Sequence, residues 1–202
     1  DSTSHIASER AISAYKGAKV WCNHALTITA HFIGAHVYAK DLASVYLSHL
    51  IIYGINALGG DLLANGADIT VTKLTLMKRV ITAITLYNTI TVDQSGNVIV
   101  YELEFDDEFE GLSGVGTLIR SVAGGHAAVR VTKAQSNVEF NYLVHCESSS
   151  NGAQIKLRDD SSTKLPVSGT QIEIEGVGNM VTVVGSTAAA NISDNTLTAA
   201  GI

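Results

Sequence analysis

The stretch VYLSHLII at residues 45–52 returns in altered form as ITVTKLTL at residues 69–76. Each stretch holds two apolar pairs with period two, as Val45 with Leu47 and Leu50 with Ile52 illustrate. Period two is the pattern of a strand with one buried face. Only five residues separate the starts of the two pairs, which leaves no room for a hairpin turn between them. We therefore predict very short strands joined by bends.

The same pairing extends over residues 18–92. It recurs at Leu26 and Ile28 and at Ile90 and Val92, and neither Gly nor Pro interrupts residues 70–91. Short strands at this spacing are typical of a β-helical winding. Two architectures satisfy the pattern: a solenoid, in which one chain stacks on its own previous turn, and an intertwined trimer, in which three chains share each layer.

Hydroxyl residues alternate with these apolar pairs, and β-branched Thr suits a strand surface that is polar without charge. The pattern predicts that the following residues face outward: Thr27, Thr29, Thr70, Thr72, Thr75, Thr85, Thr89 and Thr91. A competing interpretation makes residues 37–58 a helix, because Val37, Leu42 and Val45 have partly helical spacing. Tyr and Val crowd that segment and lower its helix propensity.

The pattern changes after the turn at residues 93–97, Asp-Gln-Ser-Gly-Asn. Longer apolar runs follow at intervals of roughly 8 to 12 residues with Gly- and Ser-rich turns between them, which is typical of an antiparallel sandwich. The sequence thus predicts an all-β protein in four parts: a short N-terminal helix or connector over 1–17, a short-strand β-helical shaft over 18–92, an antiparallel β-sandwich-like domain over 93–185, and a C-terminal tail or strand over 186–202.

Composition excludes several classes of protein. Charged residues make up 16% of the 202 residues, the net charge is −6, and the thirteen Lys and Arg are scattered, so a nucleic-acid interface is not expected. No stretch of 18 apolar residues predicts a membrane span. Cys22 and Cys146 do not make a disulfide framework, and we expect two small buried thiols. The chain begins with Asp1 and shows no signal peptide, so we expect a processed product or a fragment.

Three of the seven histidines are candidates for a site on the β-helical stretch: His31, His36 and His49. A trimer axis would bring three copies of one such histidine together and form a metal or anion site. No zinc-type spacing with Cys supports this, and surface or capping histidines are the favoured interpretation. We predict no cofactor.

The acidic run at residues 102–110 is the strongest charge feature, with Glu102, Glu104, Asp106 and Asp107 at its start. Glu102 and Glu104 alternate with apolar residues and so face one side of a strand. Paired carboxylates serve glycoside hydrolysis or calcium binding. The favoured interpretation is a solvated edge whose like charges prevent strand-to-strand aggregation. No nucleophile elbow, zincin motif or nucleotide loop occurs.

Aromatic side chains offer a further set of candidates, since exposed rings bind sugars by stacking. The candidates are Trp21, Tyr38, Tyr46, Tyr53, Tyr87, Tyr101 and Tyr142. Most of them lie in strand patterns, so core or interface packing is the expectation for most of them.

The N-terminal segment STSHIASERAI at residues 2–12 resembles a segment of tailed-bacteriophage fibre and appendage proteins, and residues 66–75, GADITVTKLT, look like the trimeric shafts of those fibres. The resemblance implies a homotrimer, a virion location, contacts with other virion proteins, and attachment to a host-surface glycan or receptor. The chain lacks the His-x-His iron-binding repeat and the self-cleaving chaperone signature of fibre tips, and no site residue carries over.

Three functions remain open from the sequence. We expect a non-enzymatic structural or adhesive component of a phage fibre. The first alternative is a polysaccharide-degrading β-helical enzyme that uses the acidic run. The second is a β-rich capsid, tail or surface-layer subunit in which residues 37–58 are helical.

Overall fold

The computed structural model describes residues 2–5, 12–30, 37–54, 62–77, 88–106, 117–133, 142–146, 152–157, 172–174, 180–184, 190–192 and 196–200. These residues are all strands and the turns between them, and they contain no helix. In particular, none of them belongs to a helix long and apolar enough to cross a membrane.

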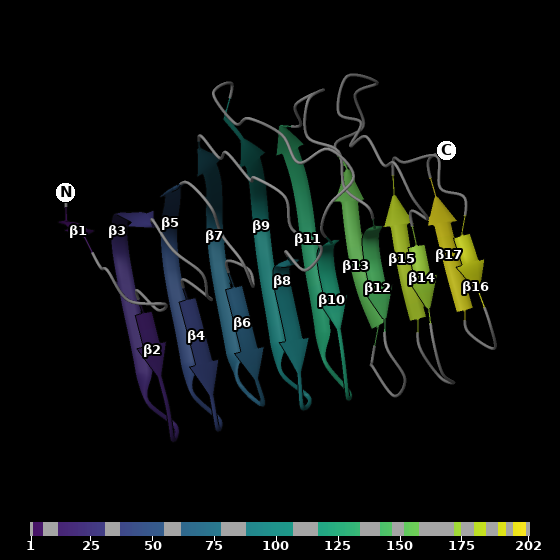
Figure 1. Cartoon of the computed structure of the whole chain (residues 1–202), viewed down its shortest axis with the longest axis horizontal. Coiled ribbons are helices and arrows are strands. Elements are labelled where there is room, and N and C mark those ends of the chain that lie inside the picture. Colours follow the sequence, from purple (N-terminus) through teal and green to yellow (C-terminus); the bar gives the residue numbers. More distant parts are fainter. Residues whose placement is uncertain are drawn as a thin grey trace.

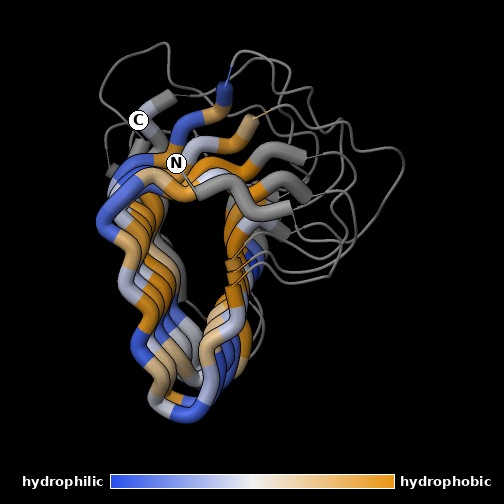
Figure 2. Tube along the Cα trace, turned by 90° about the vertical axis from the view of Figure 1, so that its left-hand side faces the viewer, coloured by the Kyte–Doolittle hydropathy of each residue, from blue (hydrophilic) through white to orange (hydrophobic). Residues whose placement is uncertain are grey.

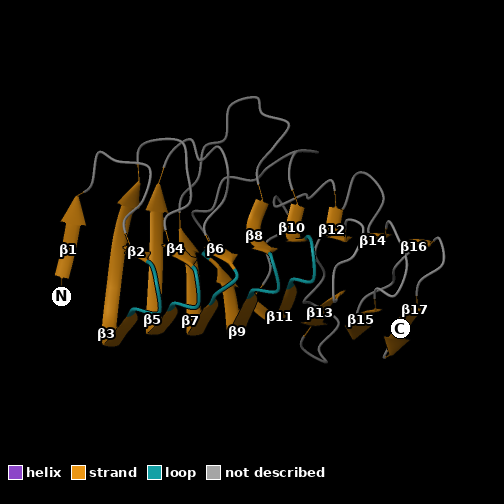
Figure 3. Ribbon diagram, turned by 90° about the horizontal axis from the view of Figure 1, so that it is seen from below, coloured by secondary structure: helices purple, strands orange, loops and turns teal. Residues whose placement is uncertain are grey.

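The described strands form two parallel sheets that face each other along the molecule (Figures 1 and 3). The odd-numbered strands make a nine-stranded sheet, which we call the odd sheet: β1 (Ser2–His5), β3 (Lys19–Ala30), β5 (Ser44–Gly54), β7 (Asp68–Met77), β9 (Asn97–Phe105), β11 (His126–Lys133), β13 (Gly152–Leu157), β15 (Met180–Val184) and β17 (Thr196–Ala200). The even-numbered strands make an eight-stranded sheet, the even sheet: β2 (Ile12–Ala14), β4 (Val37–Lys40), β6 (Leu62–Asn65), β8 (Asn88–Asp93), β10 (Thr117–Ser121), β12 (Tyr142–Cys146), β14 (Ile172–Ile174) and β16 (Ala190–Ile192).

Each strand pairs in parallel with the strand two places further along the chain, so the chain winds as a β-solenoid. This is the single-chain alternative of the two windings that the sequence left open. The partners in every ladder of the described residues belong to one chain, and an intertwined trimer is not needed to form the layers.

The core lies between the two sheets and consists of ladders of equivalent apolar residues. Leu50, Leu74 and Leu103 are register partners in the odd sheet, and all are fully buried. Leu62 and Ile90 are partners in the even sheet. Figure 2 shows the apolar positions along the inner sides of the two walls, which meet at a tight turn. In-register stacking repeats each buried position from one turn to the next, which is how a solenoid builds a continuous core.

The five-residue spacing of apolar pairs has a different origin from the one predicted. Strand β5 contains both Val45–Leu47 and Leu50–Ile52 without a break, and all four side chains are buried. Between them, Ser48 and His49 are consecutive and only partly buried, so the inward phase shifts by one residue. Strands β7 and β9 show the same shift of inward phase at the equivalent position, Thr72–Lys73 and Tyr101–Glu102. One kinked strand, rather than two short ones, therefore produces the pattern.

Tight turns connect the first five even strands, β2 to β10, to the odd strands that follow them, and these turns stack on one another. Backbone amides bond along the stack: Gly17 N donates to Asp41 O at 2.9 Å, and Gly66 N donates to Asp93 O at 2.9 Å. Several non-glycine residues in these turns have positive φ, including Leu42 at 63°. This left-handed conformation is unfavourable for L-residues with a Cβ. The hydrogen bonds between successive turns offset that cost.

Three expectations for the fold differ from the structure. Strands Ser2–His5 and Ile12–Ala14 lie where a short N-terminal helix was predicted, and no helix occurs in the described part of residues 1–17. Residues 37–54 form strands β4 and β5 and not the competing helix. The described strands between 97 and 184 pair in parallel and continue the same two sheets, so the antiparallel sandwich is absent from them. Strand spacing along the chain is similar for both arrangements and does not reveal which strands are neighbours.

We predicted that the Thr side chains of these strands face outward, and among the described residues this holds only in the odd sheet. Thr72 is exposed and Thr70 and Thr75 are half-buried, but Thr89 and Thr91 of the even sheet are buried. They alternate with the inward Ile90 and Val92, so burial extends to the second face of the even sheet. In the predicted tail, residues 190–192 and 196–200 are strands.

Candidate functional site

Parallel in-register pairing lines up outward side chains of the odd sheet in rows that cross the strands. The first outer row lies beside the turns and contains Lys19, Ser44, Asp68, Asn97 and His126. Neighbours within a row are about 4.8 Å apart, because that is the distance between paired strands. Each row therefore runs along the solenoid axis.

The second outer row lies two residues further along each strand and contains Trp21, Tyr46, Thr70, Ile99 and Ala128. It begins with two adjacent aromatic rings, which we call the aromatic platform: Trp21 and Tyr46. Their ring centroids are 5.1 Å apart, with 49° between the ring planes. Trp21 is 71% exposed. This is unusual, because Trp has the largest apolar side chain and is mostly buried in folded proteins.

Hydrogen bonds hold both rings of the aromatic platform. Trp21 Nε1 donates to Asn23 Oδ1 at 2.7 Å. The Tyr46 hydroxyl bonds the Thr72 hydroxyl, with 3.2 Å between the oxygens. These bonds satisfy the polar atoms of the rings and restrict their rotation. The apolar ring surface of Trp21 is thereby presented to solvent in a fixed orientation.

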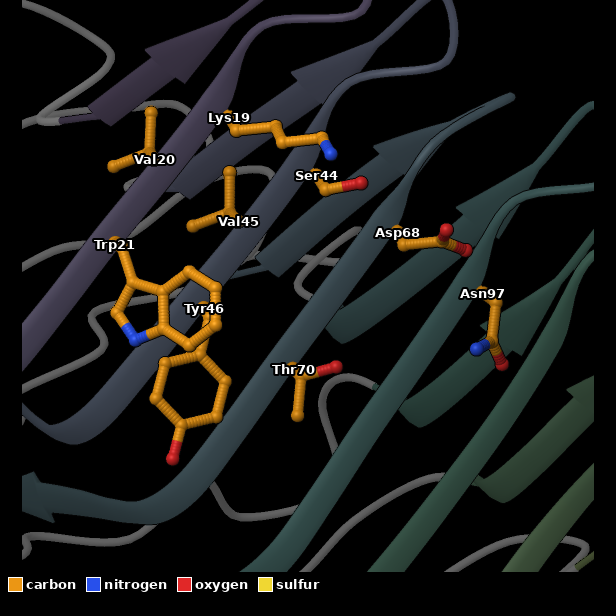
Figure 4. Close-up of a pocket in the computed structure, with 9 residues that line it drawn as sticks. All are labelled: Lys19, Val20, Trp21, Ser44, Val45, Tyr46, Asp68, Thr70 and Asn97. Carbon is orange, nitrogen blue, oxygen red and sulfur yellow. The ribbon is translucent and has the colours of Figure 1, made fainter.

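The two rows border a hollow of about 370 Å³, which we call the first hollow (Figure 4). The platform forms one side of it, Val20 and Val45 also line it, and its polar side chains are Lys19, Ser44, Asp68, Thr70 and Asn97. An ammonium, a carboxylate, an amide and two hydroxyls thus surround one apolar surface. Such a set offers both hydrogen-bond donors and hydrogen-bond acceptors.

Asn97 is held from the far side by His126. The His126 Nδ1 and Asn97 Oδ1 atoms are 3.1 Å apart. Burial lowers the pKa of His126, so its imidazole is neutral at neutral pH. Since an amide oxygen only accepts, Nδ1 is the donor in this pair. Figure 4 shows the Asn97 side-chain nitrogen on the side of Thr70 and Asp68, toward the first hollow.

A second hollow of about 290 Å³ lies further along the same face, between β9 and β11. Its outward side chains are Ile99, Tyr101, Glu102, Ala128 and Arg130. Tyr101 is 55% exposed, and Arg130 is also exposed. Aromatic surface and charged groups are again adjacent here.

The predicted acidic residues lie on this face in part. Glu102 and Glu104 of β9 both point outward, because Leu103 and Phe105 between and beyond them are buried. Glu104 forms an ion pair with Lys73, in which Oε2 lies 2.9 Å from Nζ. The Asp106 amide donates to Leu76 O at 2.9 Å. Asp107 lies outside the described residues. The pairing of Glu104 with Lys73 favours a solvated charged surface over a pair of catalytic carboxylates.

Of the three candidate histidines, His31 and His36 lie outside the described residues. His49 bonds the Thr75 hydroxyl, with 3.1 Å between Nε2 and Oγ1. Burial, followed by the nearby Lys73 charge, lowers the pKa of His49, and Glu104 opposes this. Within the described part of the chain, no three His, Cys, Asp or Glu side chains are grouped so that they could hold a metal ion.

The other aromatic and thiol candidates do not form an exposed site in the described residues. Tyr38 is buried and contacts the Tyr15 ring edge-on, with centroids 5.6 Å apart. The side chains of Tyr53 and Tyr142, and the whole of Tyr87, lie outside the description. Cys22 is a free, half-buried thiol whose Sγ donates to His24 O at 3.4 Å. The side chain of Cys146 lies outside the description, and because Cys22 is free, the structure contains no disulfide between these two cysteines.

Sequence reasoning proposed the two platform residues among seven aromatics but missed the polar row beside them. Its members precede the first inward residue of the five odd strands from β3 to β11, and these inward residues are Val20, Val45, Ile69, Val98 and Ala127. Alignment of the stretches beginning at residues 44, 68 and 97 would have found them.

Comparisons with known proteins give no relatives for this chain: no family model, no curated protein and no solved structure matches it.

Proposed function

We propose that this protein is a non-enzymatic β-solenoid that binds carbohydrate on the outer face of its odd sheet. The observation that supports this most is the exposed aromatic platform beside a row of polar side chains. A sugar ring has an apolar face of C–H groups and a rim of hydroxyls. It therefore matches an aromatic surface bordered by hydrogen-bond donors and acceptors, which is the usual composition of a small-ligand site.

The fixed orientation of the platform supports the same proposal. Rings that are already held by hydrogen bonds lose little conformational freedom when a ligand stacks on them, which favours binding. Tyr46 is held through Thr72, and Trp21 through Asn23. A ring that served only core packing would not need to stand 71% exposed.

The proposal predicts that Trp21→Ala strongly weakens glycan binding. We expect the affinity for a bound saccharide to fall by about 30-fold, equivalent to roughly 2 kcal/mol, because the largest stacking surface is lost. Trp21 is the single Trp of the chain, so its fluorescence reports on the site directly. Native protein is first screened on an array of bacterial capsular and cell-wall saccharides, and hits are titrated by fluorescence and calorimetry.

Two variants control this experiment. Leu42→Ala removes another strongly exposed apolar side chain that does not line the hollow, and it should bind like the native protein. Trp21→Phe keeps a smaller ring and should retain part of the affinity. Equal binding by native protein and Trp21→Ala, or a native protein that binds no saccharide on the array, would contradict the proposal.

We further propose that the glycan-binding solenoid is part of a virion appendage and assembles as a homotrimer. The support is the resemblance of residues 2–12 and 66–75 to phage fibre proteins. The expected result of light scattering after size exclusion is a mass three times that of the chain, retained in mild detergent. A monomer under both conditions would contradict the fibre assignment and leave the sugar-binding proposal in place.

A further inference from the structure

We propose that the ligand of the outer face is a linear glycan of several sugar units that lies along the solenoid axis and occupies both hollows. This inference rests on the proposed function and adds the class of ligand and its direction. A terminal monosaccharide would need only the aromatic platform. Three observations argue for an oligosaccharide of several linked sugars. They are the continuity of the two hollows, the distance that the hollows span, and the groups at their far end.

The two hollows adjoin each other. Thr70 lines the first hollow, and its register partner Ile99 lines the second. Asn97, at the end of the first hollow, lies two residues from Ile99 on the same strand. The outer rows therefore lead without interruption from one hollow to the next, across the strands and along the axis.

The distance from one end to the other exceeds a single sugar ring. Trp21 lies on β3 and Arg130 on β11, which are four strand pairings apart in the odd sheet. Four steps of about 4.8 Å give roughly 19 Å. A ligand that contacts both ends must therefore contain several rings in an extended chain.

A β-bulge lies beside the second hollow. Val100 pairs with Val129, and Leu103 pairs with Val131, so Tyr101 and Glu102 of β9 oppose the single residue Arg130 of β11. An extra residue of this kind bends the strand and redirects side chains. The Tyr101 ring faces outward at the level of Thr72 on β7, beside an apolar floor of Ile99 and Ala128.

Charged groups on either side of Tyr101 suit the rim of a sugar ring. The Arg130 guanidinium donates hydrogen bonds and the Glu102 carboxylate accepts them. In the described part of the chain, no carboxylate forms an ion pair with Arg130, and Glu102 has no paired cation. Within that part of the chain, neither group is occupied by an ion pair. The second hollow thus repeats the composition of the first, a ring with a donor and an acceptor beside it.

The test is binding as a function of glycan length. The probes are β-1,4-linked glucose and β-1,4-linked N-acetylglucosamine oligomers, each from the disaccharide to the hexasaccharide, titrated by calorimetry against the full chain. In at least one series, we expect affinity to increase about tenfold from disaccharide to hexasaccharide and then to level off. Tyr101→Ala should remove this gain and leave the disaccharide affinity unchanged. Tyr101→Phe, which keeps the ring, should behave like the native protein.

Three outcomes would overturn the inference. Equal affinity for short and long oligomers would indicate a single-ring site on the platform. A Tyr101→Ala variant that weakens all lengths equally, with unchanged urea unfolding, would make the second hollow part of the same small site. Lack of binding by both series overturns the inference too. The proposed function survives each of these results, and fails only if the saccharide array is also blank or Trp21→Ala binds like the native protein.

Discussion

Leu62→Ala should lower the free energy of unfolding by about 3 kcal/mol, as expected for removal of a fully buried Leu side chain that leaves a cavity. Leu62 is fully buried, and it stacks in register between Val37 and Ile90 of the neighbouring even strands. Shortening it therefore interrupts the core ladder of three successive turns. Because each turn of a solenoid is stabilised by its neighbours, the loss should lower the urea midpoint of the whole chain.

The adjacent residue provides a matched control. Leu63 has the same side chain on the same strand but points away from the core and is only half-buried. Leu63→Ala should cost about 1 kcal/mol, since less apolar area is lost and no closed cavity forms. Equal midpoints for the two variants in urea unfolding would contradict the inward assignment of Leu62 and, with it, the register of the even sheet.

Gly125→Ala should destabilise the protein by about 3 kcal/mol or more, at the upper end for single substitutions. A Cβ at this position would lie 2.5 Å from Val92 O and 2.7 Å from Val92 C. Both atoms belong to the backbone of strand β8, in the preceding turn of the solenoid. Val92 O also accepts a hydrogen bond from Val122 N at 2.8 Å. The clash is therefore relieved only by moving a backbone segment and breaking the bond that joins the two turns.

Gly17→Ala separates this steric effect from the loss of glycine itself. No atom lies within 4 Å of a Cβ at Gly17, but its φ is +72°. The expected cost is the conformational one, about 1 kcal/mol. Thermal and urea unfolding of both variants measure the difference. If Gly125→Ala were no worse than Gly17→Ala, the close approach of the turns would be wrong.

The strands of residues 45–52 and 69–76 were predictable from sequence because burial of one face imposes period two on any strand. The kink inside each of these strands was not predictable from the sequence. A shift of phase at Ser48–His49 gives the same spacing as two separate short strands. Only the stacking of equivalent shifts in β5, β7 and β9 shows that the strands are continuous.

The candidate site was likewise predictable from the sequence only in part. Trp21 and Tyr46 stood among seven aromatic candidates, and the sequence pattern did not show which of these rings become neighbours. The register of β3 and β5 makes them neighbours and leaves them on the open face, whereas Tyr38 on the even sheet is buried. Asp68 and Asn97, 29 residues apart, carried no recognisable motif, yet they are register partners.

The sequence by itself determined that the described strands between residues 18 and 92 belong to a β-helical winding and that the chain carries little charge, because these properties follow from local alternation and composition. The tertiary structure alone decided that the described strands beyond residue 93 continue the same parallel sheets and that an aromatic platform adjoins a polar row. The physical reason is that parallel pairing joins residues some 24 to 29 positions apart. Which of them become neighbours depends on the length of each turn and on bulges, and no local pattern encodes either.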